Sequence, residues 1–184
     1  MLEFKDVCFN YGNGVSVLEH INIRIGPGEF IGLGGRNGCG KTTVTRLLMG
    51  LEKPVSGEIL HDGAVINDDD ASARSHYIGY VFQRPERQMF RSTVEDEVAY
   101  GPQQLGMSRD ETAAAVAEAL AMTGLSHLAK AYPPNLNRGE KQRVAIASAI
   151  AMHTSCIILD EPTSGQDSAD KKMLMELLTD LNKK

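Results

Sequence analysis

The sequence predicts an α/β protein with a mainly parallel sheet core, an N-terminal antiparallel β subdomain and an α-helical insertion. Three patterns lead to this prediction. Apolar and polar residues alternate over residues 2–25, as in half-buried strands. The short apolar run 30–33 leads through a glycine-rich turn into a helical pattern. A block with helical periodicity, from about 92 to 152, separates two further short apolar runs.

The first part of the chain is dominated by strand patterns. Residues 2–9 alternate loosely, and the isoleucines of residues 21–25 alternate strictly, with glycines between the runs. These segments predict a small, mainly antiparallel layer. Residues 56–60 and 62–66 predict a hairpin, and the acidic residues 68–70 that follow predict a solvated loop.

Short strands and longer helices are predicted for the rest of the chain. Residues 78–82 and 156–159 are apolar runs that predict buried strands. Between them, a capping box at 108–111 precedes one helical pattern, and helical periodicity resumes at 139–152. Ser168 is predicted to be the N-cap of an amphipathic C-terminal helix.

Length and composition fit one domain over residues 1–184, with the helical insertion at about 92–137. The net charge is −5, from 19 Lys and Arg against 24 Asp and Glu, so no overall basic field attracts nucleic acid. The longest apolar stretch, 144–152, is far shorter than the ~20 residues that span a membrane. Neither a signal-peptide pattern nor a CxxC pair is present, and the histidines show no ligand-like spacing. We therefore expect a cytoplasmic protein with no metal held by protein alone.

A phosphate-binding motif lies between the predicted strand 30–33 and the helix after it. Residues 35–42 are Gly-Arg-Asn-Gly-Cys-Gly-Lys-Thr and fit the pattern G-x-x-x-x-G-K-[ST]. Glycines let backbone N–H groups turn towards phosphate oxygens, and a helix N-terminus favours an anion. Lys41 is predicted to reach the β- and γ-phosphates, and the Thr42 hydroxyl to ligate Mg²⁺. An accidental turn is the alternative, but the flanking strand and helix patterns favour nucleotide binding.

Two acidic residues follow the apolar run 156–159. Asp160 is predicted at the carboxyl end of a strand, where open α/β sheets bind ligands, and we expect it to face Mg²⁺. Glu161 is then positioned to orient or deprotonate an attacking water. The sequence lacks the Asn-Lys-x-Asp motif of GTPases, which favours ATP over GTP. Capping of the next helix is the alternative role for this pair, and the upstream motif disfavours it.

Between these motifs lies Leu136-Asn-Arg-Gly-Glu-Lys-Gln-Arg-Val-Ala-Ile-Ala147, which resembles the start of the signature helix in the ATP-binding subunits of ABC transporters. The resemblance extends from the first strand to residue 184. It implies that Tyr11 stacks on adenine, that Gln83 is the Q-loop residue, and that residues 164–167 form the D-loop. Taken alone, Tyr11 is more typical of a core aromatic and Gln83 of an exposed polar residue.

The motifs and the resemblance together define a predicted ATP site. Residues expected to contact the nucleotide are Tyr11, Gly35, Asn37, Gly38, Cys39, Gly40, Lys41, Thr42, Thr43, Asn137 and Gly139. Lys41, Gln83 and Glu161 are the expected catalytic residues. Thr42, Gln83 and Asp160 are the expected ligands of Mg²⁺. ATP and Mg²⁺ are accordingly the expected cofactors.

A narrower resemblance lies in residues 82–90, 93–102 and 105–106, which are similar to the A component of energy-coupling factor transporters, importers of vitamins and of cobalt or nickel. It implies a head-to-tail dimer of two ATPase subunits, identical or different, that grips coupling helices of a membrane T component. A separate S component selects the substrate. The resemblance places the chain peripherally on the inner face of the cell membrane. The acidic run 95–97 fits docking to a basic partner helix, with a solvated helix face as the alternative.

The chain departs from the family pattern in three ways. Asn137 and Arg138 stand where Ser and Gly are usual, so the contact with the partner subunit's γ-phosphate is expected to weaken, and Asn137→Ser with Arg138→Gly to restore it. Glu140 stands where the usual residue is Gln, and Cys39 replaces the usual Ser in the phosphate-binding loop. No residue matches the family's switch histidine, because the sequence ends at residue 184 before that strand.

Two functions from different classes fit these patterns. The first is an ATP-hydrolysing subunit that drives membrane import. The second is a nucleotide-binding module that turns ATP over poorly, because the signature is altered and the switch histidine is missing. An ABC-type ATPase that acts on DNA or ribosomes is a weaker alternative, because the sequence has no coiled-coil or basic insertion.

Overall fold

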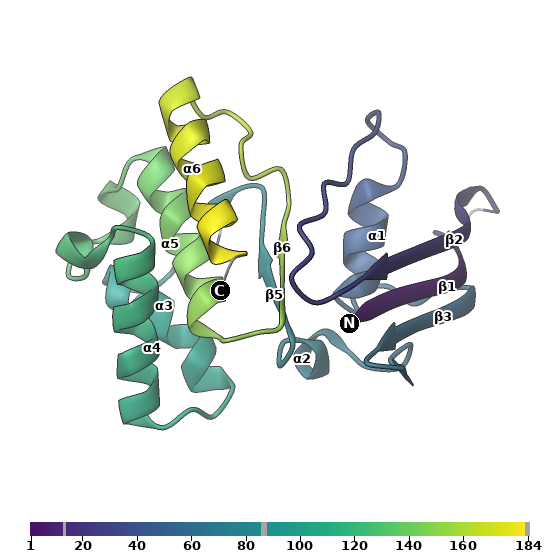
Figure 1. The fold of residues 1–184 in the computed structure, drawn as a ribbon, viewed down its shortest axis with the longest axis horizontal. Coiled ribbons are helices and arrows are strands. Elements are labelled where there is room, and N and C mark those ends of the chain that lie inside the picture. The colour runs from purple at the N-terminus through teal and green to yellow at the C-terminus, as the bar shows by residue number, and fades with distance from the viewer. Residues whose placement is uncertain (13, 86–87, 183–184) are drawn as a thin grey trace. The chain divides into compact units, whose positions relative to one another are not determined.

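The computed structural model describes residues 1–12, 14–85 and 88–182. The chain divides into two compact units, Met1–Ser75 and His76–Lys184. The first unit contains an antiparallel sheet and helix α1, and the second contains a short parallel sheet and the longer helices (Figure 1).

The sheet of the first unit has the strand order β2-β1-β3-β4, and every pairing in it is antiparallel. Its strands are β1 (Leu2–Asn10), β2 (Ser16–Ile25), β3 (Ser56–His61) and β4 (Ala64–Val65). The alternation in the sequence corresponds to the buried residues of β1, which are Leu2, Phe4, Val7 and Phe9. The predicted antiparallel layer and the β3–β4 hairpin are therefore confirmed.

Helix α1 (Lys41–Leu48) begins directly after the glycine-rich loop, as predicted. Its C-terminal end is held by Arg74, the last residue of the short helix α2 (Ala71–Arg74). The Arg74 side chain is fully buried and donates hydrogen bonds to the carbonyl oxygens of Leu47, Leu48 and Ile66. The last carbonyls of a helix lack intrahelical donors, and this guanidinium supplies them.

The predicted strand at 30–33 is not formed, and this part of the prediction is wrong. Phe30, Ile31 and Leu33 are about half exposed, and no sheet pairing among the described residues includes them. A strand requires a neighbouring strand to satisfy its N–H and C=O groups. The first unit has only its antiparallel sheet in the part of the chain that is described, whereas the parallel strands belong to the second unit.

In the second unit, β5 (Ile78–Val81) and β6 (Cys156–Leu159) pair in parallel, with Ile78 opposite Cys156 and Val81 opposite Leu159. Ile78 and Val81 are buried, as the sequence predicts. All four residues of β6 are only partly buried, which corrects the prediction of a fully buried strand. The reason is that the described pairings give β6 one neighbouring strand, so its other edge lacks strand cover.

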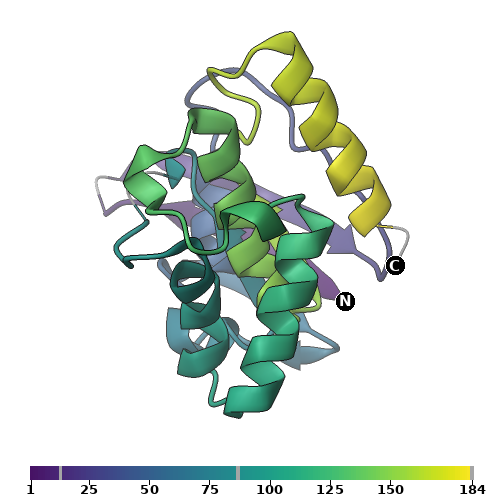
Figure 2. The ribbon, with the colours of Figure 1, turned by 90° about the vertical axis from the view of Figure 1, so that its left-hand side faces the viewer.

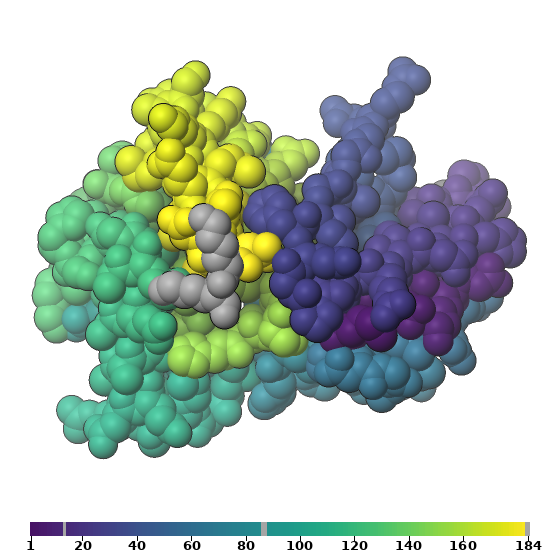
Figure 3. All heavy atoms as spheres, in the orientation of Figure 1, coloured from purple at the N-terminus to yellow at the C-terminus, as the bar shows by residue number. Residues whose placement is uncertain are grey.

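Over its described residues, the second unit also contains four longer helices and the short 3₁₀ helices η2 and η3. They are α3 (Val94–Gln104), α4 (Arg109–Met122), α5 (Arg138–Ala151), α6 (Ser168–Leu181), η2 (Ser126–Leu128) and η3 (Pro133–Asn135). Helices α3, α4 and α5 pack together around one core, which includes Val98, Ala119 and Val144 (Figure 2). Helix α6 packs through Leu174 and Leu178 with buried residues of α5, while its other face is open to solvent, as the yellow surface in Figure 3 shows.

The helix starts follow from local hydrogen bonds. Ser108 caps α4, and Glu111 reaches back to the Ser108 backbone, so the predicted capping box is confirmed. The N-cap of α6 is Asp167 rather than the predicted Ser168, because the Asp167 carboxylate accepts from the N–H of Asp170 at 2.9 Å. Within the described ranges, none of the helices has the length and apolar character needed to cross a membrane.

Candidate active site

The phosphate-binding loop lies in the first unit, between residue 34 and the start of α1. Gly40 caps α1 in the left-handed conformation, with φ 94°. The Lys41 ammonium donates hydrogen bonds to the carbonyl oxygens of Gly35 at 2.8 Å and Arg36 at 3.1 Å. Lys41 is therefore held within its own loop, at the exposed N-terminus of a helix, where cation and N–H groups together suit a phosphate. The Thr42 side chain, next along the chain, is exposed.

Glycine at position 35 is a packing requirement of this loop. A Cβ atom there would lie 2.6 Å from the Cys39 sulfur. Cys39 is exposed, and the Lys41 ammonium lies 4.0 Å from its sulfur. The replacement of the usual Ser by Cys is thus accommodated because its neighbour lacks a side chain. Asn37 and Gly38 occupy exposed positions in the same loop.

Tyr11 is about half exposed and fixed in place, which distinguishes it from a core aromatic. Its hydroxyl lies 3.1 Å from the Thr43 hydroxyl, and its ring meets Phe9 edge-on at 4.8 Å between centroids. Thr43 itself is buried, so its hydroxyl anchors Tyr11 to the first turn of α1. The stacking of Tyr11 on adenine stays a prediction.

The predicted catalytic carboxylates lie in the second unit, at the carboxyl end of β6. The Asp160 N–H donates to the Val81 carbonyl at 2.9 Å, which extends the β5–β6 pairing by one bond. The Tyr80 hydroxyl donates to the Asp160 carboxylate at 3.3 Å. The strand end therefore fixes both the backbone and the carboxylate of Asp160.

Gln83 and Glu161, which are 78 residues apart in sequence, are brought together by the parallel strands. The Gln83 amide donates to a Glu161 carboxylate oxygen at 2.5 Å. Glu161 has a φ of 45°, in the left-handed region that costs a non-glycine residue about 1 kcal/mol or more. Such conformations cluster at functional sites, where the surrounding structure maintains them. The contact joins two of the three predicted catalytic residues.

The altered signature begins helix α5 with a second capping box. The Asn137 side-chain oxygen accepts from the Glu140 N–H at 2.8 Å, and the Glu140 carboxylate accepts from the Asn137 N–H at 2.9 Å. The Asn137 amide therefore turns N–H donors, rather than its oxygen, towards any ligand. Gly139 allows α6 to approach, since a Cβ there would lie 2.9 Å from the Asp170 carboxylate.

The interpretation of the acidic run 95–97 as a docking surface is wrong for Glu97. The Glu97 side chain is buried and accepts hydrogen bonds from the backbone N–H groups of Phe90 and Arg91 at 2.9 and 2.8 Å. Glu95 is paired with Lys130, and this pair holds the pKa of the Lys130 ammonium above its usual value. Glu97 thus stabilises the loop ahead of α3, a role for which the sequence carries no signal.

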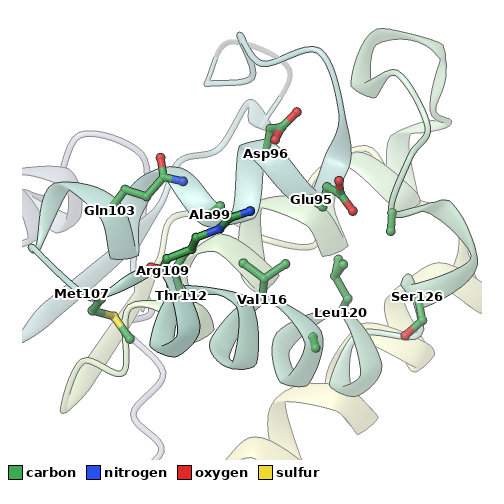
Figure 4. Close-up of a pocket in the computed structure, with 13 residues that line it drawn as sticks. Glu95, Asp96, Ala99, Gln103, Met107, Arg109, Thr112, Val116, Leu120 and Ser126 are labelled. Atoms are coloured by element: carbon green, nitrogen blue, oxygen red, sulfur yellow. The ribbon is translucent and has the colours of Figure 1, made fainter.

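A cavity of about 810 Å³ lies between α3 and α4 (Figure 4). Glu95 and Asp96 stand at the end formed by the first turn of α3, whereas apolar side chains such as Val116 and Leu120 line its base. The buried Thr112 hydroxyl, which also lines the cavity, has no hydrogen-bond partner among the described residues. The cavity therefore combines an apolar base with an acidic rim.

The residues expected to bind Mg²⁺ offer a hydroxyl, an amide and a carboxylate, and these hard oxygen donors suit that ion. Thr42 belongs to the first unit, and Gln83 and Asp160 belong to the second. The part of the chain that is described contains no cluster of three or more His, Cys, Asp or Glu residues able to hold a metal by themselves.

Comparison with known proteins identifies the family. Residues 18–164 match the family model described as ABC transporter. The chain belongs to the ABC transporter family. One relative of this ABC cassette is the energy-coupling factor transporter ATP-binding protein EcfA of Methanocaldococcus jannaschii, with 41% identity over 186 residues that cover all of this chain and 67% of the relative.

Solved structures agree with this assignment. CbiO1 from Clostridium perfringens, described as part of the ABC transporter complex CbiONQ, superposes with a TM-score of 0.92 at 36% identity, over 99% of this chain and 73% of CbiO1. The dimeric cassette MJ0796, in a post-hydrolysis state with ADP and Pi, gives a TM-score of 0.83 at 32% identity, over 99% and 83% of the two chains. The cassette spans about one third to two thirds of the length of the first curated relatives that it matches.

Proposed function

We propose that this chain is the ATP-binding and ATP-hydrolysing subunit of an energy-coupling factor importer of vitamins or transition-metal ions. The hydrogen bond between Gln83 and Glu161, beside Asp160, carries the proposal. It joins the amide of Gln83 to the carboxylate of Glu161, a residue with a left-handed backbone conformation. Both lie at the strand end where ABC ATPases are expected to activate water. The names of the EcfA relative and of the CbiONQ complex support the type of transporter.

The predicted site residues are proposed to have the following roles towards ATP. Lys41 exchanges its two carbonyl partners for the β- and γ-phosphates, while Tyr11 stacks on the adenine. Thr42, Gln83 and Asp160 would hold Mg²⁺, which would supply positive charge to neutralise the transferring phosphoryl group. Glu161 orients the attacking water and accepts its proton, and Gln83 keeps the Glu161 carboxylate in position.

A second ATPase subunit is proposed to complete the site, in a homodimer or a heterodimer. In this arrangement Asn137 and Gly139 of one subunit present N–H donors to the nucleotide held by the other. The dimeric state of the MJ0796 cassette supports the proposal. Nucleic acid has no place in this function, which agrees with the net charge of −5.

The membrane partner is proposed to dock on the second unit at the inner face of the cell membrane. The cavity between α3 and α4 offers an apolar base and the carboxylates of Glu95 and Asp96, which suit an amphipathic coupling helix with basic residues. The T component would supply this helix, and the S component would contact the substrate without touching the ATP site.

Two substitutions test the proposed ATP binding and ATP hydrolysis separately.

Lys41→Ala is expected to abolish ATP binding while the fold is retained, because Lys41 contributes a loop cation rather than core packing. Glu161→Gln is expected to retain binding and to slow hydrolysis in the assembled transporter. Isothermal titration with Mg-ATP and steady-state phosphate release measure the two effects. Lys53→Ala, which removes an exposed ion pair with Asp68 in the first unit, is the control. Unchanged ATP affinity in Lys41→Ala would refute the nucleotide site.

The second candidate is a nucleotide-binding module with little or no ATPase activity. The capping role of Asn137 favours it, because the residue that replaces the signature Ser uses its oxygen to start α5. Single-turnover hydrolysis in the assembled complex separates the candidates. A rate no higher than that of Glu161→Gln would favour the module.

A further inference from the structure

Arg138, the first residue of α5, contacts the loop that follows Glu161. Its guanidinium donates a hydrogen bond to the Ser164 carbonyl at 2.7 Å. The same guanidinium lies over Gly165, so closely that a Cβ atom at that position would overlap it. Gly165 has a φ of 67°, so both its conformation and its lack of a side chain are required there.

Two hydrogen bonds connect Arg138, through Ser164, to the backbone of Glu161. Ser164, whose carbonyl accepts from Arg138, donates its own N–H to the Glu161 carbonyl at 3.0 Å. The Glu161 side chain in turn accepts from Gln83. Glu161 is therefore restrained from two directions: its side chain by Gln83 and its backbone, through Ser164, by Arg138.

Two buried polar side chains lie beside the contact between Arg138 and the loop 164–166. One helical turn after Arg138, the buried Gln142 amide nitrogen faces a small cavity that is also lined by Gln166. The Gln142 nitrogen and the Gln166 oxygen are both buried without a protein partner among the described residues. Among the described residues, these two side-chain atoms therefore make no hydrogen bond between the loop 164–166 and α5, whereas Arg138 does.

We propose that Arg138 is a positioning residue for ATP hydrolysis, which holds the loop 164–166 against α5 in the same chain and thereby maintains the left-handed conformation of Glu161. The proposal rests on the proposed role of Glu161 in activating water. It reverses the expectation from the sequence pattern. Arg138→Gly restores the usual family residue, yet it removes the clamp and lowers the hydrolysis rate.

The first test compares Arg138→Gly, Arg138→Ala and Arg138→Lys with the parent chain. Arg138→Gly and Arg138→Ala are expected to lower kcat by roughly 10²-fold, as for a small displacement of a catalytic group, with KM for Mg-ATP unchanged within about twofold. Arg138→Lys keeps one donor for the Ser164 carbonyl and is expected to recover part of kcat. Arg143→Ala is the matched control, because Arg143 lies on the same helix but contacts Met173 of α6.

Amide hydrogen exchange provides a readout that does not require turnover. Exchange at residues 161–166 is expected to accelerate in Arg138→Ala, and to stay at the parent rate in Arg143→Ala. The parent chain could fail to hydrolyse ATP while exchange at residues 161–166 is still faster in Arg138→Ala than in the parent. This result would refute the proposed activity but support the contact between Arg138 and the loop 164–166. Unchanged exchange and unchanged kcat in Arg138→Ala would overturn the clamp itself.

A double-mutant cycle tests the same contact from the other side. Gly165→Ala places a methyl group where the guanidinium lies, and should reduce kcat and accelerate exchange as Arg138→Ala does. In the Arg138→Ala background the same substitution should cost less, because only the backbone strain at position 165 remains. Additive effects on kcat and on exchange would overturn the proposal, and circular dichroism of each variant shows whether it folds.

Discussion

At the scale of single residues, the phosphate-binding loop carries an exposed thiol. Cys39 is exposed, whereas Cys8 and Cys156 are partly buried. Burial also raises the pKa of the Cys156 thiol, which lowers its thiolate fraction at neutral pH. N-ethylmaleimide is therefore expected to modify Cys39 first and to block nucleotide binding, and Mg-ATP to protect it. Mass spectrometry of the modified peptides measures the order in which the thiols react. If N-ethylmaleimide reduced nucleotide binding equally in the parent and in Cys39→Ser, the prediction would be contradicted.

Arg74 is a buried charged residue whose replacement should destabilise the first unit. Its fully buried guanidinium donates to the carbonyls of Leu47, Leu48 and Ile66. In Arg74→Leu all three lose this donor, while the Leu47 and Ile66 carbonyls keep bonds from backbone N–H groups. We expect a loss of about 3 kcal/mol in the free energy of unfolding, measured by urea titration. Arg46→Ala, which removes a partly exposed pair with Glu52, should cost under about 1 kcal/mol. Similar losses of unfolding free energy in Arg74→Leu and Arg46→Ala would show that burial of Arg74 does not determine its contribution to stability.

At the scale of secondary-structure elements, the capping box of α4 predicts a pH dependence. Hydrogen bonds from the Ser108 side chain and backbone hold the pKa of Glu111 below its ordinary value of 4.5. A carboxylate with a depressed folded-state pKa stabilises the fold above its unfolded value, and this contribution is lost as the pH falls through the folded pKa. The stability difference between the parent and Glu111→Gln should thus be full at pH 7 and shrink below pH 4.5. Urea unfolding across this pH range measures the difference, with Glu118→Gln as the control. A stability difference between the parent and Glu111→Gln that stayed constant with pH would contradict the prediction.

At the scale of the whole molecule, the predicted function depends on a second subunit. Asn137→Ser supplies the usual signature hydroxyl and keeps the cap of α5, because Ser and Asn are comparable N-caps. We expect it to raise kcat by up to about 10²-fold at protein concentrations where dimers form, and to leave dilute protein unchanged. Phosphate release over a range of concentrations measures this. The prediction would be contradicted if turnover of the parent rose steeply with protein concentration and equalled that of Asn137→Ser.

The sequence by itself predicted most of the features that depend on near neighbours in the chain, although it placed the N-cap of α6 one residue too late. Alternation over residues 2–25 predicted the antiparallel strands, and the spacing around 35–42 predicted the loop and helix that position Lys41. The box at 108–111 predicted the start of α4. Periodicity and capping are local, because they follow from side chains within a few positions of one another. The apolar run 30–33 shows the limit of such patterns, since apolar character alone does not supply a pairing strand.

Only the tertiary structure decided the contacts between distant residues. Gln83 meets Glu161 because β5 and β6 pair in parallel, and Arg138 meets Ser164 because α5 starts beside the loop after Glu161. The burial of Glu97 and of Arg74 is equally invisible in the sequence, where both resemble ordinary surface charges. A charged side chain becomes a tertiary anchor when packing removes it from water and backbone groups become its partners. Which charged residues become buried depends on the folded arrangement of the chain. The motifs therefore located the predicted catalytic residues, whereas the tertiary structure determined which other residues hold them in position.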